Sequence, residues 1–306
     1  MILTKELDKK LYEYCDELLV LKNLSLTTIK NYCTTNKSFI KYLKDNNIIE
    51  LDYIDEILKK YIIYLRKENN NTYSTINKYI QQIIQFLKHI SFEINIELPK
   101  DNSKNKKIKY LKPKEIKEVF KSISERNIRD KAIMQTLYRT GLRVSELANL
   151  KKYNLDLQSK ESAIAIDVED GKGSKDRTVY IDQLTLELIN TMIYKRTRKN
   201  KRDKNDYLFT ARTGNGISSR SIEQLVKKYA IATDKRLAKE GIKTNFEKKL
   251  TPHTLRHSFT IYLLNHAKKP INEVQTLLGH TNISTTQIYT KIDDETIKNS
   301  YQSIIW

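Results

Sequence analysis

The N-terminal third of the chain carries apolar residues at the three- and four-residue spacing of amphipathic helices. Four such patterns follow one another, at Leu7, Leu11, Tyr14, Leu18 and Leu21; at Ile29, Tyr32, Cys33, Phe39, Ile40 and Leu43; at Ile54, Leu58, Tyr61, Ile62 and Leu65; and at Ile76, Tyr79, Ile80, Ile83, Ile84 and Leu87. Ser74 or Thr75 is a suitable N-cap for the fourth helix. All seven glycines lie from Gly141 onward, so no glycine interrupts this part. The pattern predicts a small helical bundle.

The periodicity stops at residues 98–113, LPKDNSKNKKIKYLKP. This segment is polar, basic and bounded by prolines, which indicates a domain boundary. We therefore expect a helical domain over residues 1–98, a basic linker over 99–112 and a second domain over 113–306. A basic linker is either solvated or laid along phosphates, and its place between two basic domains favours the second use.

The second half mixes helical patterns with one short sheet. Helices are expected over 115–123 and 129–138, and again from Ser221 and from Thr251. Two alternating runs flank the turn DGKGSKD and predict a β-hairpin; their apolar positions are Ile164, Ile166 and Val168, then Val179 and Ile181. The basic run KRTRKNKRDK, residues 195–204, is expected to be an exposed loop or a helix end. The predicted fold class is mainly α with a small β-sheet.

Composition places the chain among globular proteins with two domains. It has 306 residues, of which 39% are apolar. No apolar run is long enough for a membrane span, and MILTKELDKK lacks the apolar core of a signal peptide, so a cytoplasmic protein with no membrane partner is expected. Cys15 and Cys33 have no metal-type spacing and are interpreted as small buried apolar residues.

The net charge changes the picture more than the composition does. The formal charge is +19 and the pI is near 9.6, which favours a polyanionic partner, most commonly nucleic acid. The alternative is coding bias, because Lys, Ile, Asn and Tyr are all abundant, as AT-rich genes would produce. Charge alone names no reaction.

The stretch TPHTLRHSF predicts a helix with basic residues in its first turn. Thr251 is a good N-cap and Pro252 suits the first helical position. His253 and Arg256, three residues apart, can both donate hydrogen bonds to a phosphate near that helix end. His253 and His257 also have zinc-ligand spacing, but HTLRH lacks the glutamate of HExxH and carries an arginine beside a ligand. A capped helix with incidental basic residues is the third reading.

Two further stretches add candidate phosphate contacts. In RTGLRVSEL, Arg143 follows a glycine turn and can pair with Glu146, which would hold the guanidinium in one orientation. The alternative is a surface ion pair of at most about 1 kcal/mol. Lys172 lies in GKG at the hairpin turn, where glycines allow a ligand to approach the backbone, although most turn lysines are simply solvated.

The stretch LLGHTNISTTQIYT contains a candidate nucleophile. Gly279 is expected to end a helix, His280 to follow it, and Ser284 to cap a short helix carrying Tyr289. A phenol, with a pKa near 10, attacks phosphorus well only where positive groups stabilise the charge that it passes on. Two arginines can do so without a metal ion, and the sequence has no acidic cluster typical of a Mg²⁺ site. No metal and no cofactor is expected.

In this order, RTGLRVSEL, GKGSKDR, HTLRHSF, LLGH and TTQIYT resemble the tyrosine recombinase (phage integrase) family, and within it the Xer-type recombinases. The resemblance implies a tyrosine-recombinase catalytic domain of mixed α/β structure, and a SAM-like helical core-binding domain before it. It implies site-specific recombination of DNA through a 3′-phosphotyrosyl intermediate and a Holliday junction, without metal or ATP.

The resemblance also implies a role for each candidate residue. Tyr289 is the nucleophile, Arg143 and Arg256 hold the scissile phosphate, and His280 donates to a non-bridging oxygen. The remaining roles are general acid, proton transfer at the tyrosine and support of Arg143, and they fall to Lys172, His253 and Glu146.

The implied partners are double-stranded DNA with specific core sites and other recombinase subunits. The family works as a homo- or hetero-tetramer on two duplexes, so a cytoplasmic, nucleoid-associated location follows. The apolar tail IKNSYQSIIW, residues 297–306, either folds back on its own domain or docks on a neighbouring subunit. The alternatives are a type IB-like topoisomerase, a DNA-binding module without catalysis, and a zinc enzyme using His253, His257 and His280.

Overall fold

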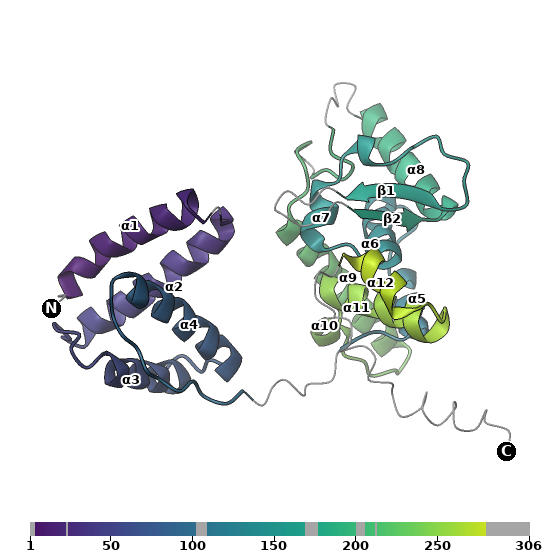
Figure 1. Ribbon diagram of the computed structural model, residues 1–306. Coiled ribbons are helices and arrows are strands. Elements are labelled where there is room, and N and C mark those ends of the chain that lie inside the picture. Colours follow the sequence, from purple (N-terminus) through teal and green to yellow (C-terminus); the bar gives the residue numbers. More distant parts are fainter. Residues whose placement is uncertain are drawn as a thin grey trace, which may run out of the picture. The chain divides into compact units, whose positions relative to one another are not determined.

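The computed structural model describes residues 4–22, 24–101, 109–168, 177–199, 206–211 and 213–279, with the side chains of 197–199 left out. The chain forms two compact units, Met1–Lys106 and Lys107–Trp306 (Figure 1). Within the described segments, every helix is either too short or too polar to serve as a membrane span.

The first unit is a bundle of helices, as the apolar spacing predicts. Its elements are η1 (Thr4–Glu6), α1 (Leu7–Val20), α2 (Leu26–Asp45), α3 (Ile54–Lys67) and α4 (Tyr73–His89). The Ser25 hydroxyl caps α2 by accepting from the Thr28 amide at 3.0 Å. Thr72 caps α4 in the same way, so the expected cap at Ser74 or Thr75 is wrong by two or three residues. Most residues of the predicted apolar stripes lie in the core, with Phe39 and Leu58 fully buried, but Leu21 is 73% exposed, so its expected place in the first stripe is wrong.

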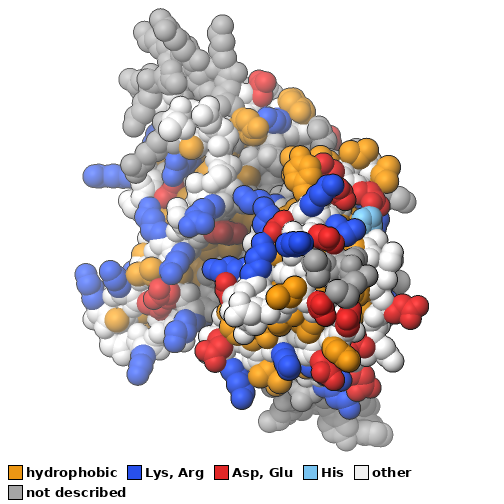
Figure 2. All heavy atoms as spheres, turned by 90° about the vertical axis from the view of Figure 1, so that its left-hand side faces the viewer, with side chains coloured by type: hydrophobic (Ala, Val, Ile, Leu, Met, Phe, Trp, Pro, Cys, Tyr) orange, Lys and Arg blue, Asp and Glu red, His pale blue; other side chains and the backbone are white. Residues whose placement is uncertain are grey.

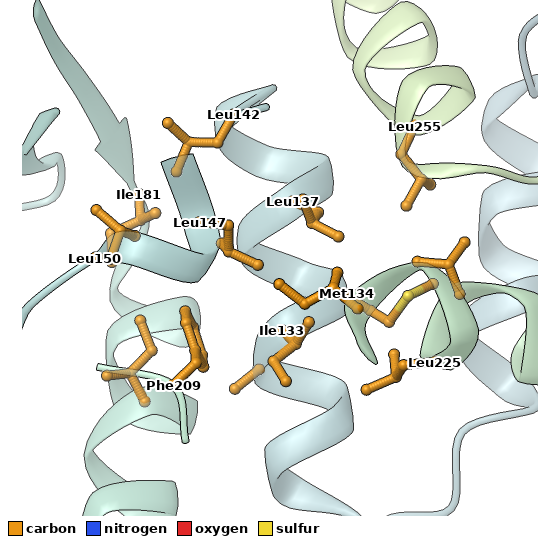
Figure 3. Close-up of a cluster of buried hydrophobic side chains, with 14 of the residues drawn as sticks. Ile133, Met134, Leu137, Leu142, Leu147, Leu150, Ile181, Phe209, Leu225 and Leu255 are labelled. Atoms are coloured by element: carbon orange, nitrogen blue, oxygen red, sulfur yellow. The ribbon is translucent and has the colours of Figure 1, made fainter. Parts of the chain in front are cut away.

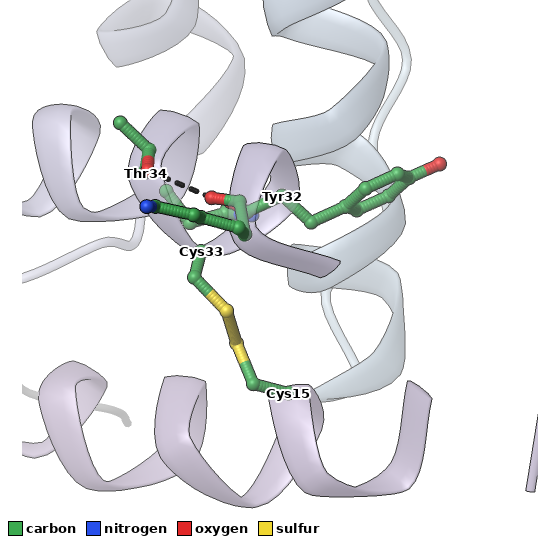
Figure 4. Close-up of a disulfide and its surroundings, with 6 residues drawn as sticks. Cys15, Tyr32, Cys33 and Thr34 are labelled. Carbon is green, nitrogen blue, oxygen red and sulfur yellow. Dashed lines mark hydrogen bonds between the residues drawn. A yellow bond between two sulfur atoms is a disulfide. The ribbon is translucent and has the colours of Figure 1, made fainter. Parts of the chain in front are cut away.

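The two cysteines correct a second expectation. Cys15 on α1 and Cys33 on α2 are joined by a disulfide, with their Cα atoms 6.5 Å apart (Figure 4). Both residues are partly buried against the core of this unit, so their apolar surroundings are as expected, but they are not free thiols. A separation of 18 residues carries no pairing signal, because the bridge depends on how α1 and α2 pack side by side.

The second unit contains eight helices of the α class in its described part, one 3₁₀ turn, one π-helical turn and a two-stranded sheet. In chain order these are α5 (Pro113–Lys121), α6 (Ile128–Thr140), α7 (Val144–Asn149), η3 (Lys152–Asn154), β1 (Ile164–Val168), β2 (Arg177–Ile181), α8 (Gln183–Lys199), α9 (Ser219–Lys239), α10 (Phe246–Lys249), α11 (Pro252–Ile261), the π-helical η4 (Tyr262–His266) and α12 (Ile271–Leu278).

The predicted hairpin is present. Strands β1 and β2 pair antiparallel, with Ile164 opposite Ile181 and Val168 opposite Arg177. The alternating apolar residues of both strands face the core, which is why the period of two identified the strands. The turn between them, including Lys172, lies outside the described residues.

Helix α8 is an element that the sequence interpretation did not anticipate. Asp182 caps it, accepting from the Thr185 amide at 2.9 Å, and Leu186, Ile189 and Met192 bury its inner face. The basic run from residue 195 continues this helix to Lys199. The N-cap aspartate followed by apolar residues three apart was the available signal.

Helix α6 lies at the centre of the second core (Figure 3). Its residues Ile133, Met134 and Leu137 are 0 to 1% exposed and are surrounded by side chains from α7, α9, α11 and the segment carrying Phe209. Since α6 ends at the turn that carries Arg143, this core fixes where that turn emerges.

We expect Leu137→Ala to lower the free energy of unfolding by about 2–5 kcal/mol, because truncation leaves a cavity in a packed core. Leu184→Ala is the matched control: the same atoms are removed from a side chain that is 64% exposed, so a change within about 0.5 kcal/mol is expected. Urea unfolding followed by circular dichroism measures both. Equal losses would contradict the central position of α6.

Candidate active site

The turn after α6 places Arg143 and Glu146 together. Gly141 ends the helix with φ of +61°, and a side chain there would meet the Phe259 ring at 2.7 Å, so only glycine fits. Arg143 then opens α7: its amide donates to Glu146 Oε2 at 2.6 Å and its Nη1 donates to Oε1 at 2.7 Å. The predicted pairing is confirmed. The surface alternative is not, because the Glu146 side chain is only 6% exposed.

A residue that the sequence interpretation missed completes this pair. Arg177, the first residue of β2, donates from Nη1 to Glu146 Oε1 at 3.0 Å and from Nη2 to Oε2 at 2.7 Å. This two-pronged arrangement is the geometry in which a guanidinium recognises a carboxylate best. The only sequence signal was the arginine that ends GKGSKDR, which lies directly after a basic turn and was assigned no role.

The two arginines decide the charge of Glu146. Burial alone would raise the pKa of its carboxyl, but the hydrogen bonds from Arg177 and from the Arg143 amide outweigh it and lower the pKa to about 2. Because the pKa is depressed on folding, this stabilisation is complete above the ordinary value of 4.5 and is lost as the pH falls toward 2. Glu146 is therefore a permanent anion at neutral pH.

Arg256 connects this turn to a distant helix. The predicted cap is present, since Thr251 accepts from the Thr254 amide at 3.1 Å, and Arg256 lies one turn later, 5% exposed. Its Nη1 donates to the Gly141 carbonyl at 2.5 Å and its Nη2 to the Leu278 carbonyl at 2.6 Å. Both carbonyls lie at helix C-termini, where the backbone carries negative partial charge. Arg256 thus holds the turn that leads to Arg143.

Two arginine side chains donate hydrogen bonds to the C-terminal end of α12. Arg256 holds the Leu278 carbonyl, and Arg177 Nε donates to the Leu277 carbonyl at 3.2 Å. Gly279 ends the helix as expected, in the left-handed conformation with φ of +63°. Arg143 and Arg177 share the Glu146 carboxylate, and Arg256 donates to backbone carbonyls beside them, so the three arginines and one glutamate leave two positive charges in excess. Such a cluster suits a bound anion.

Within the described residues, the histidines of α11 have no third ligand for a metal ion. His253 is exposed in the first turn, whereas His257 is half-buried. Burial, and then the nearby His253 and Arg256, lower the pKa of His257 to about 4, so it is neutral at pH 7. No group of three His, Cys, Asp or Glu side chains in the described part of the chain is arranged to hold a metal ion.

Three predicted site residues, Lys172, His280 and Tyr289, lie outside the described residues. The described chain nevertheless brings two of their flanking positions into contact. A Cβ built on Gly279, the residue before His280, would lie 2.7 Å from Cδ of Arg177, five residues after Lys172. The ends of α12 and β2 therefore meet at the arginine cluster.

Comparison with known proteins adds a family to this geometry. Residues 109–296 match the phage integrase family, and residues 10–90 match the phage integrase SAM-like domain. Tyrosine recombinase XerD of Staphylococcus epidermidis is 30% identical over 305 residues, covering 94% of this chain and 96% of that relative. Tyrosine recombinase XerC of Histophilus somni is 28% identical and covers 95% of each chain.

Solved structures give the same fold. The crystal structure of XerA recombinase shares 27% identity with a TM-score of 0.54, over 98% of this chain and 99% of that one. XerH recombinase in a post-cleavage complex with a palindromic difH substrate shares 22% identity with a TM-score of 0.72, over 96% and 83%. Because one family match spans well over half of the residues and the relatives align along nearly all of it, the chain belongs to the phage integrase family and is a tyrosine-type site-specific recombinase.

Proposed function

We propose that this recombinase cuts and rejoins double-stranded DNA at specific core sites, with Arg143 and Arg256 holding the scissile phosphate and Tyr289 attacking it. The observation that carries the proposal is the anchoring of the two arginines. Arg143 is oriented by a buried, ionised Glu146, and Arg256 by two helix-terminal carbonyls. Guanidinium groups fixed before the reaction stabilise developing charge without having to reorganise.

The proposed chemistry exchanges one phosphodiester for another. The Tyr289 oxygen bonds to phosphorus as the bond to the 5′-oxygen breaks, giving a 3′-phosphotyrosyl link and a free 5′-hydroxyl. Lys172 gives the leaving oxygen its proton, His253 assists removal of the phenol proton, and His280 donates to a non-bridging oxygen. A 5′-hydroxyl from another strand reverses the step. The phosphotyrosine keeps the bond's free energy, so neither ATP nor a metal ion is required.

The charge distribution supports the DNA partner. The chain carries a net charge of +19, and Lys and Arg side chains are spread over the face drawn in Figure 2, with Asp and Glu side chains among them. We assign DNA binding to the helical domain, residues 1–98, to the basic linker, 99–112, and to the catalytic domain, 113–306. The XerH relative was solved on its difH substrate and a lambda integrase dimer on a core site, which supports this assignment.

The proposed assembly is a homo- or hetero-tetramer on two duplexes, which exchanges strands in pairs through a Holliday junction. Residues 297–306 are proposed to dock on a neighbouring subunit and so couple one Tyr289 to the state of the next. A protein acting in this way is bound to the nucleoid.

We expect Tyr289→Phe to bind its DNA normally and to form no covalent adduct on a nicked suicide substrate, because the substitution removes only the attacking oxygen. Denaturing gel electrophoresis of the trapped complex measures the adduct, and a mobility shift measures binding. An adduct in the Tyr289→Phe protein would show that another residue is the nucleophile. Relaxed circles without recombinant products from the wild-type protein would indicate a topoisomerase instead.

We expect Arg256→Ala to slow cleavage by about 10²–10³-fold, by analogy with the loss of one donor from an oxyanion site. Arg256→Lys should remain impaired, since an ammonium cannot donate to the Gly141 and Leu278 carbonyls in the same fork. Arg126→Ala, at an exposed position in the turn before α6, is the control and should cleave within about threefold of wild type. A near-normal cleavage rate of the Arg256→Ala protein would show that Arg256 does not contact the phosphate.

Binding should weaken steeply with salt, because Lys and Arg side chains that neutralise phosphates release counterions. Between about 50 and 200 mM salt we expect affinity to fall on the order of a thousandfold or more, as for six or more phosphate contacts. Fluorescence anisotropy of a labelled duplex measures the slope. An affinity independent of salt would mean that the basic surface does not face DNA.

A further inference from the structure

The guanidinium of Arg177 is the most deeply enclosed cation of the site apart from that of Arg256. Its side chain is 7% exposed, and three of its N–H groups have identified acceptors: both Glu146 oxygens and the Leu277 carbonyl. These acceptors belong to segments 31 and 100 residues away from it in sequence. A buried charge with this many partners is positioned by the fold rather than by chance contact.

The ion cluster contains two arginines, Arg143 and Arg177, for the one carboxylate of Glu146, and this ratio indicates a function for Arg177. Glu146 is a buried anion that must be neutralised, and the Arg143 side chain donates one hydrogen bond to it, from Nη1. Arg177 reaches it through two, in a fork. If Arg177 were absent, Arg143 would be the sole counter-ion of a buried carboxylate, and its charge would be cancelled. With Arg177 present, Glu146 orients Arg143 without cancelling it.

Arg177 also packs closely against Gly279, at the C-terminal end of α12. Any side chain at position 279 would lie 2.7 Å from Arg177 Cδ and 3.0 Å from Nε, the atom that holds the Leu277 carbonyl. The last turn of α12 is therefore shaped around the Arg177 side chain, and the chain leaves this turn toward His280.

We propose that Arg177 is a positioning residue of the recombinase: it neutralises Glu146 so that Arg143 keeps its charge for the scissile phosphate, and it sets the turn of α12 that precedes His280. The inference rests on the proposed function of Arg143. Arg177 itself touches no DNA in this scheme, and its effect on cleavage passes through Glu146 and Leu277.

A suppressor experiment tests whether Arg177 acts on cleavage through Glu146 and Arg143. Arg177→Met should slow adduct formation on the suicide substrate by about 10²-fold, comparable to the loss of one phosphate donor, with DNA affinity nearly unchanged. Glu146→Gln in the same chain removes the anion that Arg143 would otherwise neutralise. The double variant is therefore expected to cleave about tenfold faster than Arg177→Met alone. A double variant slower than Arg177→Met would overturn the proposal, because removing the anion would then have restored no activity to Arg143.

The pH dependence gives an independent readout. In the wild type, the pKa of Glu146 is about 2, so its carboxylate stays ionised down to that pH. Arg177 on β2 and Arg143 in the turn before α7 supply its charged contacts, and removal of Arg177 raises that pKa. The ratio of the Arg177→Met rate to the wild-type rate should then rise as the pH falls from about 8 to 5, since protonated Glu146 no longer cancels Arg143. A ratio that is flat or falls in acid contradicts the proposal.

The double variant carries the test even if Arg177→Met fails to fold. Removing one partner of a buried ion pair is far more costly than replacing both, so Arg177→Met with Glu146→Gln should fold. Its cleavage should lie within about tenfold of Glu146→Gln alone. A loss greater than about a hundredfold would overturn the proposal.

A pair of glycine variants tests the turn of α12. Gly279→Ala should slow cleavage at least about tenfold more than Gly241→Ala, which has a similar left-handed φ of +78° but no atom within 4 Å of the added Cβ. Equal cleavage rates of the two variants would show that the close contact between position 279 and Arg177 does not affect cleavage. Each experiment includes the wild-type protein and its Tyr289-dependent covalent adduct. If the wild type forms no such adduct, the proposed function is refuted. If the wild type forms the adduct and the Arg177 variants cleave normally, only the inference about Arg177 is refuted.

Discussion

A buried carboxylate needs positive partners within hydrogen-bonding distance, and the Glu146 carboxylate has two of them. Arg143 binds it from the same turn and Arg177 from β2, and together they hold its pKa at about 2 against the cost of burial. The position of Arg143 depends on this cluster, because an arginine side chain at a helix start has many rotamers and only the carboxylate selects one. The hairpin is tied to α7 by the same interaction.

The helix ends of the catalytic unit extend this constraint. Helices α6 and α12 both end in a left-handed glycine, Gly141 and Gly279, and at each end a carbonyl is left without an intrahelical partner. Arg256 satisfies one carbonyl from each helix, so its guanidinium binds the two ends together. The orphan acceptors of two helices thus become the frame that fixes a cation, and the positive charge in turn complements the helix dipoles.

Most patterns local in sequence were read correctly, the cap of α4 and helix α8 excepted, and contacts distant in sequence were not. The hairpin, the four N-terminal helices and the Thr251 cap all follow from spacings of two to four residues, and so does the pairing of Arg143 with Glu146. The disulfide of Cys15 with Cys33, and the role of Arg177, depend on which helices and strands pack together, which no short spacing records. Arg177 was overlooked because an arginine after GKGSKD is indistinguishable in sequence from a solvated one.

Because these contacts join residues far apart in sequence, the arginine cluster depends on the fold of the whole second unit. The Arg256 contact with Gly141 spans 115 residues and the Arg177 contact with Leu277 spans 100, so the arginine cluster forms only when the whole second unit is folded. Tyr289 is the tenth residue after Gly279, and such a tether reaches at most about 35 Å. Because both arginines hold α12 at its last turn, they fix the point from which that tether starts. The same two side chains that belong to the proposed phosphate site therefore limit the region within which Tyr289, the proposed nucleophile, can act.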